Sequence, residues 1–417
     1  MFEPYIRFFA NENVQEGLRI LYHSSFVWLP AFLAITLFDI WLQYKRESWI
    51  QTQNYLLLEV KVPREISKSP KAMEFFMNGL FKKGDKEADW WELYVQGHTR
   101  PVSSLEIVSI DGQVHFFVRV VGWLKEIVES QLYSQYPGIE IFEVPDYTLP
   151  ISHDPETRGL VGTEFILSQA DVFPIKTYID YGMDKDPKEE FKIDPLTPFI
   201  EHIASFGRGH QFWLQIVIRA HKEEDKDPKT GKKVDLKWKK DAEKQIEDIL
   251  KKSKAEIDKE TGKIIPGTGR FLTQAEQDTI TALDRSISKN GFDVGMRLMY
   301  TAPKDIYATS NISGAVGSIM HFSSQNLNSF KTSNWTGGKY TFPWQDMRKK
   351  KTNLEKVEML DAYKHRGFFY KPHKRKYFVL NTEELATIFH FPGQVSTTPT
   401  FSRIESKKAE APANLPV

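Results

Sequence analysis

The chain has 417 residues, a length that predicts two or three domains, and its 27% charged and 41% hydrophobic residues are typical of globular protein. Its 56 Lys and Arg residues balance 55 Asp and Glu residues, which excludes a global charge field that would attract nucleic acid. It has no Cys, which excludes disulfides, thiol catalysis and Cys-ligated zinc and is consistent with a cytoplasmic bulk.

Residues 26–43, FVWLPAFLAITLFDIWLQ, form the near-continuous apolar run of the sequence. A helix needs roughly 18–20 apolar residues to cross a bilayer core, so this run predicts a single membrane span. Aromatic residues bracket the run, and an acidic group near its end costs less than one at the bilayer centre. The residues that we expect to form the anchor are Phe26, Trp28, Pro30, Asp39, Trp41, Lys45 and Arg46.

The alternatives for this run are a buried core helix and an amphipathic helix on the membrane surface. A cleaved signal peptide is disfavoured, because the N-terminus is not basic and no small-residue cleavage site follows. Lys45 and Arg46 directly after the run predict a single-pass membrane protein with its bulk in the cytoplasm. Residues 1–49 are therefore an N-terminal amphipathic segment, with a short interfacial helix, and the span.

Residues 50–150 follow the order strand–helix–strand–strand–helix–strand. Asp111-Gly112 predicts a hairpin turn, and Ser69-Pro70 and Pro137-Gly138 mark a helix start and a helix stop. This order predicts a ferredoxin-like α/β sandwich. The expected strands are 55–63, 90–95, 105–110, 114–121 and 139–144, and the expected helices are 69–80 and 124–136.

Residues 151–345 again alternate strands with helices and predict a second, larger ferredoxin-like domain. The capping box that begins at Thr273 opens a helix. The expected strands lie within 163–179 and at 211–220 and 292–302, and the expected helices are 194–203, 273–288 and 311–330. The charged insertion 222–269 is rich in Lys, Asp and Glu and has one helical stripe, so it reads as a solvated helical insertion or as a docking arm.

Residues 346–393 predict a small C-terminal region, a basic hairpin over 368–380 and a helix that Asn381 and Glu384 cap. Residues 394–417 form a tail or linker. Basic groups contact phosphate and aromatic rings stack on bases, so this region is a candidate nucleic-acid surface, although buried hairpin aromatics with a solvated turn explain the same pattern. The candidate partner or nucleic-acid contacts are Arg348, Lys349, Lys350, Lys351, Lys374, Arg375, Asn381 and Glu384.

We searched the sequence for three common catalytic motifs and found none of them. A phosphate-binding GxxxxGK[ST] loop does not occur, and neither does GxSxG or HExxH. His202, His210 and His221 lack ligand spacing. We therefore expect no catalytic residue, no cofactor and no metal, and we expect that the chain is not an enzyme.

Several stretches together resemble a known family. They are LLLEVKVPREISKSPKAME (56–74), SSLEIVSIDGQVHFFVRV (103–120), ESQLYSQYPGIEI (129–141), DPLTPFIEHIASFGRGHQFWLQIVIR (194–219), NGFDVGMRLMY (290–300), LNTEELATIFHFPG (380–393) and RIESKKAEAPANLP (403–416). This pattern resembles the N-terminal, non-ATPase part of type IV secretion and conjugation-type proteins of the HerA/FtsK superfamily, in the version common in uncultivated small-genome bacteria. In such proteins, segments like 380–393 and 403–416 precede a P-loop ATPase domain.

The resemblance implies an α+β protein that acts as a membrane-anchored, non-catalytic scaffold and docks a hexameric P-loop ATPase moving DNA or protein. Residues 381–392 and the tail would form the surface facing the motor. Such an accessory subunit would be a homo-oligomer within the assembly. The alternative is a membrane-tethered nucleic-acid-binding protein with DNA as partner, which uses the basic, aromatic C-terminal hairpin.

Overall fold

The computed structural model describes residues 12–63, 68–82, 89–184, 194–222, 225–226, 233–234, 237–253, 271–338, 340, 342 and 344–393. The chain divides into two compact units. We call them the anchor unit (Met1–Gln53 and Lys86–Thr99) and the body (Asn54–Asp85 and Arg100–Val417). The protein is a mixed α+β protein with one long apolar N-terminal helix and an antiparallel sheet, as expected at this level of description.

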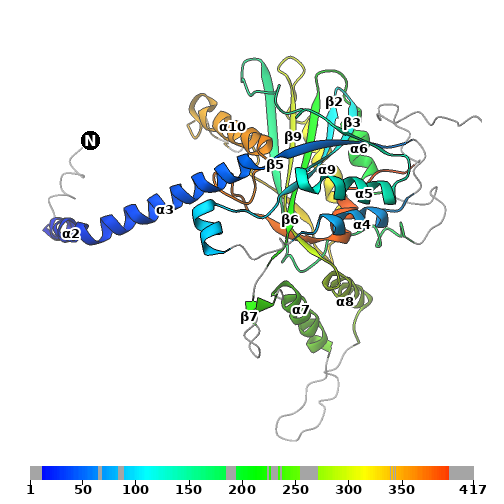
Figure 1. Ribbon diagram of the computed structural model, residues 1–417, viewed down its shortest axis with the longest axis horizontal. Helices are drawn as coiled ribbons and strands as arrows, with labels where there is room; N and C mark the ends of the chain where they lie inside the picture. Colours follow the sequence, from blue (N-terminus) through cyan, green and yellow to red (C-terminus); the bar gives the residue numbers. More distant parts are fainter. Residues whose placement is uncertain are drawn as a thin grey trace, which may run out of the picture. The chain divides into compact units, whose positions relative to one another are not determined.

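The anchor unit consists of α2 (Glu12–His23), α3 (Ser25–Thr52) and a π-helical turn, η1 (Glu92–Gln96), and α3 is one long helix (Figure 1). The strand that we expected at 90–95 is wrong. A few alternating residues cannot separate a strand from one helical turn, and here the Glu92 carboxylate accepts the Asp89 N–H at 3.1 Å. Gly97, at φ +80°, ends the turn in a left-handed conformation. Residues 1–11 of the expected amphipathic segment lie outside the described residues.

The body is built on a nine-stranded sheet with strand order β10-β5-β9-β6-β2-β3-β1-β4, in which β11 also pairs with β9. Every pairing between these strands is antiparallel. The strands are β1 (Tyr55–Lys61), β2 (Ser103–Ile110), β3 (Gln113–Val121), β4 (Glu140–Glu143), β5 (Arg158–Leu167), β6 (Gln211–Ala220), β9 (Gly291–Pro303), β10 (Phe330–Ser333) and β11 (Phe378–Asn381).

The sheet contains the same strand order twice. Numbered within each half, the four strands β1 to β4 lie in the order 4-1-3-2, and so do β5, β6, β9 and β10. The halves join where β2 pairs with β6, from Ser103 opposite Ile218 to Ile110 opposite Gln211. The strands of 50–150 and 151–345 therefore form one sheet, while the domain boundaries stay predictions.

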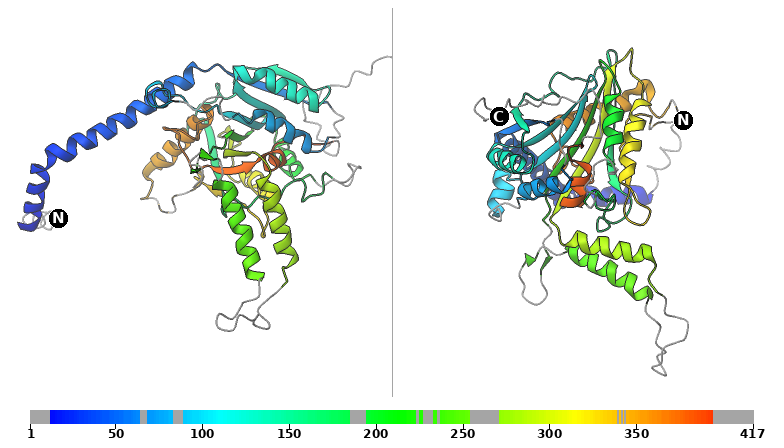
Figure 2. Two further views of the ribbon diagram at one scale, coloured as in Figure 1. Left: turned by 60° about the horizontal axis from the view of Figure 1, so that its bottom comes forward. Right: turned by 90° about the vertical axis from the view of Figure 1, so that its right-hand side faces the viewer.

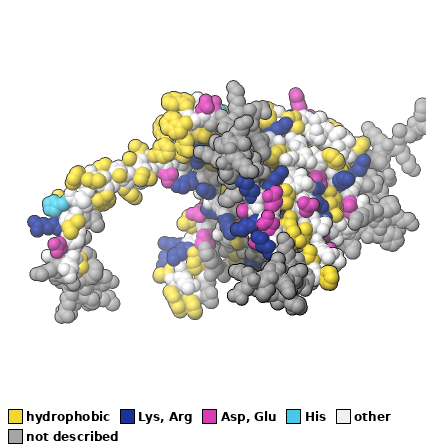
Figure 3. All heavy atoms as spheres, turned by 90° about the horizontal axis from the view of Figure 1, so that it is seen from below, with side chains coloured by type: hydrophobic (Ala, Val, Ile, Leu, Met, Phe, Trp, Pro, Cys, Tyr) yellow, Lys and Arg dark blue, Asp and Glu magenta, His cyan; other side chains and the backbone are white. Residues whose placement is uncertain are grey.

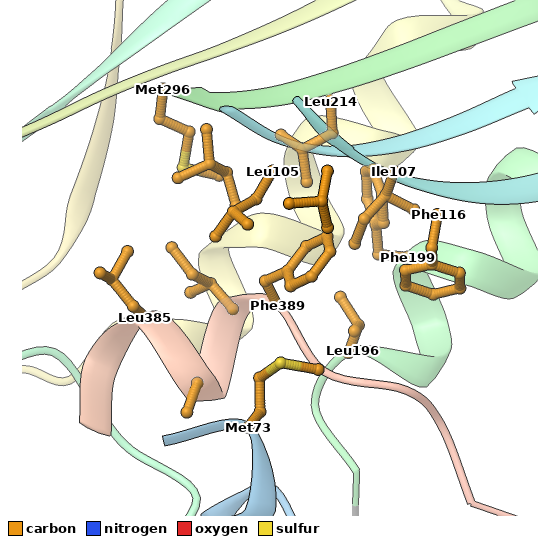
Figure 4. Close-up of a cluster of buried hydrophobic side chains, with 14 of the residues drawn as sticks. Met73, Leu105, Ile107, Phe116, Leu196, Phe199, Leu214, Met296, Leu385 and Phe389 are labelled. Carbon is orange, nitrogen blue, oxygen red and sulfur yellow. The ribbon is translucent and has the colours of Figure 1, made fainter. Parts of the chain in front are cut away.

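Helices cover one face of this sheet, and their side chains form the main core with Ile107, Leu214 and Leu298. Figure 4 shows Ile107 and Leu214 in this core. They are α4 (Lys71–Leu80), α5 (Lys125–Gln135), α6 (Thr197–Ala204), α9 (Asn311–Ile319) and α11 (Thr382–Ile388). The neighbouring residues Val108, Trp213 and Met299 point to the opposite face, because side chains alternate along a strand. There they pack against α10 (Lys350–Lys364).

The charged insertion contains α7 (Lys237–Ser253), which lies beside α8 (Gln274–Ile287) (Figure 2). Trp238 and Ala242 of its apolar stripe are buried against Leu283 of α8, with Ile246 and Ile249 packed around them. The stripe therefore packs within the chain. Asp225–Lys226 (β7) pairs with Lys233–Val234 (β8). The described part of 222–269 consists of Lys222, these two short strands and α7.

Two further expectations fail in the C-terminal half. The helix expected over 311–330 ends early, because the 3-10 turn η4 (Met320–Phe322) follows α9 and β10 then joins the sheet edge. The hairpin expected over 368–380 is wrong, because β11 pairs with the first residues of β9 and Phe368 and Phe369 are buried beside Val217. The short elements η2 (Gly122–Leu124) and η5 (Met347–Lys349) complete the described fold.

Candidate functional site

The helix α3 exposes its apolar side chains along its length (Figure 3). Its most apolar stretch has a mean hydropathy of 1.8, and only 6% of that stretch is buried. Phe26, Ile35 and Leu37 are 77%, 70% and 69% exposed. Removing one such side chain from water contributes about 1.5–3 kcal/mol, so a row of them strongly favours an apolar environment. The N-terminal helix is long and apolar enough to span a membrane.

The predicted anchor residues all lie on α3, as a run of one helix requires. Pro30 lies inside the helix, which continues past it. Near the other end, the Lys45 ammonium lies 4.8 Å from the centre of the Trp41 ring. A cation over an indole face is a favourable pair at the boundary between apolar and aqueous surroundings.

The basic run Arg348 to Lys351 is exposed where α10 begins. The Asp346 carboxylate accepts the backbone N–H groups of Lys351 (2.8 Å) and Thr352 (2.9 Å) and so fixes the helix start. The rings of Phe342 and Trp344 stack at 4.7 Å. Exposed apolar side chains therefore accompany the cations, and we call this surface the basic–aromatic ridge. Its members are Phe342, Trp344, Met347, Arg348, Lys349, Lys350, Lys351, Leu354 and Val357.

Lys374 and Arg375 do not form one basic hairpin surface. Lys374 is exposed, whereas the Arg375 guanidinium lies 3.8 Å from Glu164 and 3.9 Å from Glu358. Arg375 also lines a cavity of about 230 Å³ together with these acids and Glu355. Acidic neighbours balance its charge within the chain.

The aromatic rings near Arg375 are held by Arg219. Its guanidinium lies 4.2 Å from the centre of the Phe369 ring and 5.3 Å from those of Tyr370 and Tyr377. Phe369 and Phe378 are buried. These rings pack within the protein, as a structural role predicts, and are not a free platform for stacking bases.

Asn381 and Glu384, expected at a partner surface, are each only 1% exposed, so the expectation that α11 faces a partner is wrong. The expected capping box is present: the Asn381 side chain accepts the Glu384 N–H at 2.9 Å, and Glu384 accepts the Asn381 N–H at 2.8 Å. Glu384 also accepts the Ile175 N–H at 2.8 Å. Burial nevertheless raises the pKa of Glu384 to about 8.

A buried ionic cluster ties the segment after α10 to the sheet, and we did not expect it. Arg366 pairs with Glu106 of β2 at 2.9 Å and with Asp146. The hydroxyls of Tyr147 and Tyr363 lie 2.7 Å apart beside Glu106. Although burial opposes the charged form, Arg366 keeps the pKa of Glu106 below its ordinary value. The only signal in the sequence is a Glu within an apolar strand.

The three histidines that we considered as metal ligands each have a separate partner. His202 contacts the Asn311 carbonyl (3.0 Å), His210 the Tyr300 hydroxyl (2.9 Å) and His221 the Asp293 carboxylate (2.5 Å). Among the described residues, a different group, Asp361, His365 and His373, has ligand-type atoms within 4.8 Å of one another. The Asp361 carboxylate lies 3.3 Å from each imidazole, and burial lowers the pKa of His373.

Comparison with protein families places residues 42–403 in the Domain of unknown function DUF8128, and the chain belongs to this family. No curated protein matches the sequence.

Among solved structures, the chain is similar to xylooligosaccharide oxidase from Myceliophthora thermophila C1 in complex with xylobiose, with 10% identity and a TM-score of 0.26. The match covers 82% of this chain and 55% of the oxidase, so the chain spans about half the length of that structure. The expectation that the chain is not an enzyme is contradicted by this match, because the matched chain is an oxidase. The TM-score is too low for the match to support an activity here.

Proposed function

We propose that this chain is a membrane-anchored scaffold subunit of a type IV secretion or conjugation-like translocation system, which docks a P-loop ATPase of the HerA/FtsK type. The observation that carries the proposal is α3, an apolar helix of 28 residues in which Leu42 alone is buried. Lys45 and Arg46 lie on this helix just after its apolar run. A helix that exposes this much apolar surface needs lipid or a partner to cover it.

In this proposal α3 crosses the bacterial cytoplasmic membrane once, and the bulk of the chain is cytoplasmic, because Lys45 and Arg46 follow the span. Each half of the sheet is a ferredoxin-like domain. The strand order 4-1-3-2 in each half, with a helix between its first and second strands and another between its third and fourth, supports this assignment.

The basic–aromatic ridge is the surface through which the chain binds the ATPase. Trp344 and Met347 are 72% and 73% exposed, and Leu354 is 59% exposed. Exposed aromatic and apolar groups beside four cations are suited to a protein partner with an acidic, partly apolar surface. We place the ATPase-binding surface on the ridge and not on α11, because α11 is buried. Several copies of the chain would form a homo-oligomer around the ATPase.

A second candidate function is membrane-tethered nucleic-acid binding. It is favoured by the exposure of Arg348 to Lys351 beside the stacked rings of Phe342 and Trp344, since cations contact phosphate and open rings stack on bases. The ridge, and not a hairpin, would be the binding surface.

The deciding experiment is a tagged pull-down of the full chain from detergent-solubilised membranes of its host, followed by mass spectrometry and an ATPase assay. The scaffold proposal expects a P-loop ATPase, recovered with wild type and lost with Lys349→Glu/Lys350→Glu. The matched control is Lys244→Glu/Lys251→Glu on α7, which makes the same charge change at exposed positions and should retain the ATPase.

Two results would contradict the scaffold proposal: recovery of no ATPase with wild type, or fractionation of wild type as a soluble protein. Retention on DNA that falls with salt and is lost in Lys349→Glu/Lys350→Glu, in the absence of an ATPase, would establish the nucleic-acid alternative instead.

A further inference from the structure

The anchor unit contains a second exposed apolar element, residues 89–98, which we call the collar segment. In the sequence it stands between α4 and β2, yet it belongs to the same unit as α3. Trp90 and Trp91 are 65% and 58% exposed, and Leu93 is 37% exposed. Two adjacent tryptophans left in water beside a leucine form an apolar surface that the described protein does not cover.

The opposite side of the collar segment packs on α3. The Tyr94 ring lies 5.9 Å from that of Phe38, and the His98 ring stacks on Trp49 at 3.8 Å. Gly97 lies directly against the helix backbone, since a Cβ there would come within 2.4 Å of the Lys45 carbonyl carbon. The turn η1, drawn in cyan, accordingly lies beside the second half of α3 (Figure 2).

These contacts set the level of the collar segment along α3. They run from Phe38 to Trp49, about 16 Å of helix at a rise of about 1.5 Å per residue, and they bracket the end of the apolar run at Gln43. The Trp41 and Lys45 pair lies in the same stretch. This is the level at which a spanning helix leaves the hydrocarbon and enters the lipid headgroups.

We infer that the collar segment is a second membrane-binding element, which places Trp90, Trp91 and Leu93 in the headgroup layer at the end of α3. This rests on the proposed span. The occupant is lipid, because the exposed surface continues that of α3 within one unit and consists of indole rings, which favour the boundary between apolar and polar surroundings. Lys45 and Arg46 at the same level add attraction for lipid phosphate. The collar would hold α3 at a fixed depth.

The absence of Cys makes a clean test practical, because each label has one attachment point. Full-length Leu93→Cys, Leu33→Cys and Leu149→Cys would carry an environment-sensitive fluorophore in vesicles of phosphatidylcholine and phosphatidylglycerol. Position 33 reports the centre of the span, and position 149, 71% exposed in the body, reports water. Lipids brominated at shallow or deep carbons and an aqueous quencher then give the depth of each label.

The expected result is that shallow-brominated lipid quenches the label at 93 most, deep-brominated lipid quenches the label at 33 most, and the aqueous quencher reaches 93 severalfold less than 149. Trp90→Ser/Trp91→Ser in the Leu93→Cys background should raise aqueous access at 93 toward that at 149. Trp123→Ser, which removes a 55% exposed tryptophan from the body, should leave it unchanged.

Aqueous access at 93 equal to that at 149, with 33 protected, would overturn the collar and leave the span intact. Full aqueous access at 33 would overturn the span and the collar together. Protection at 93 that persists after both tryptophans are replaced would also overturn the collar, since the indole rings would then not hold the segment in lipid.

Discussion

The helices α3 and α11 both carry apolar side chains, and their surroundings are opposite. Of the residues of α3, Leu42 alone is buried, whereas all 7 residues of α11 are buried. α11 lies in the core beside Met73 of α4 (Figure 4). We expected the first to leave the protein for lipid and the second to face a partner. The apolar pattern identified both as helices but did not indicate what covers α11.

The polar residues of α11 explain the error. Thr382, Glu383 and Glu384 resemble the solvated end of a surface helix, yet the protein satisfies them internally. Glu383 pairs with Arg285 at 3.1 Å and with Lys289 at 2.9 Å. Buried charges persist when they are paired and hydrogen-bonded, so a polar helix start does not by itself mean exposure.

The largest expected effect comes from truncating one aromatic ring in α3 and one directly after α11. Phe389, directly after α11, is fully buried, whereas Phe32 of α3 is 60% exposed. Phe389→Ala should lower the free energy of unfolding by about 3–5 kcal/mol, because it removes buried contacts and leaves a cavity. Phe32→Ala should leave the unfolding of the body unchanged. Denaturant unfolding of the detergent-solubilised chain measures both, and equal losses would remove the contrast between the helices.

The next effect tests α3 directly. An Asp at the centre of a spanning helix costs about 2.5–3.5 kcal/mol, so Leu33→Asp should shift the chain out of the membrane fraction that resists alkaline extraction. Leu149→Asp, at an exposed site of the body, should not change this fraction. If Leu33→Asp stays as firmly membrane-bound as wild type, position 33 does not lie in hydrocarbon.

Local signals in the sequence predicted much of the fold. The strand 211–220 matches β6 residue for residue, the Asp111-Gly112 turn joins β2 to β3, and both capping boxes are present. These features depend on neighbours in sequence, where spacing and turn chemistry act. The collar segment and β11 depend on distant partners, because Gly97 packs on Lys45 and β11 pairs with β9. No local pattern encodes such a partner.

The same limit applies to the candidate site. The exposed run Arg348 to Lys351 is a local feature and was found, whereas the role of Arg219 among the aromatic rings joins strand β6 to residues far along the chain. The burial of Asn381 and Glu384 likewise follows from the packing of α4 and α8 around α11. Contacts of this kind became visible only in the folded protein.

A smaller effect concerns the buried carboxyl of α11. Because the pKa of Glu384 is raised to about 8 in the folded state, that state binds more protons than the unfolded chain between the ordinary glutamate pKa and about 8. Stability should therefore fall as pH rises through this window. Relative to Glu384→Gln, which keeps the capping oxygen, wild type should lose about 2 kcal/mol between roughly pH 6 and 8. Urea unfolding at several pH values measures this, and parallel curves for the two proteins would refute the raised pKa.

The smallest expected effect is a difference between two capping boxes that have the same hydrogen-bond pattern. Thr273 caps the exposed start of α8, and Asn381 caps the buried start of α11. Thr273→Ala should cost about 1 kcal/mol, the usual value of an N-cap. Asn381 also donates to the Ser286 hydroxyl at 2.9 Å, so Asn381→Ala leaves a buried hydroxyl without this partner. Its cost should exceed that of Thr273→Ala by about 1 kcal/mol. Denaturant midpoints of the two variants at one pH decide the point. Equal costs would mean that water reaches the start of α11 as readily as it reaches that of α8. The contrast between a buried α11 and an exposed α3 would then not hold at this end of α11.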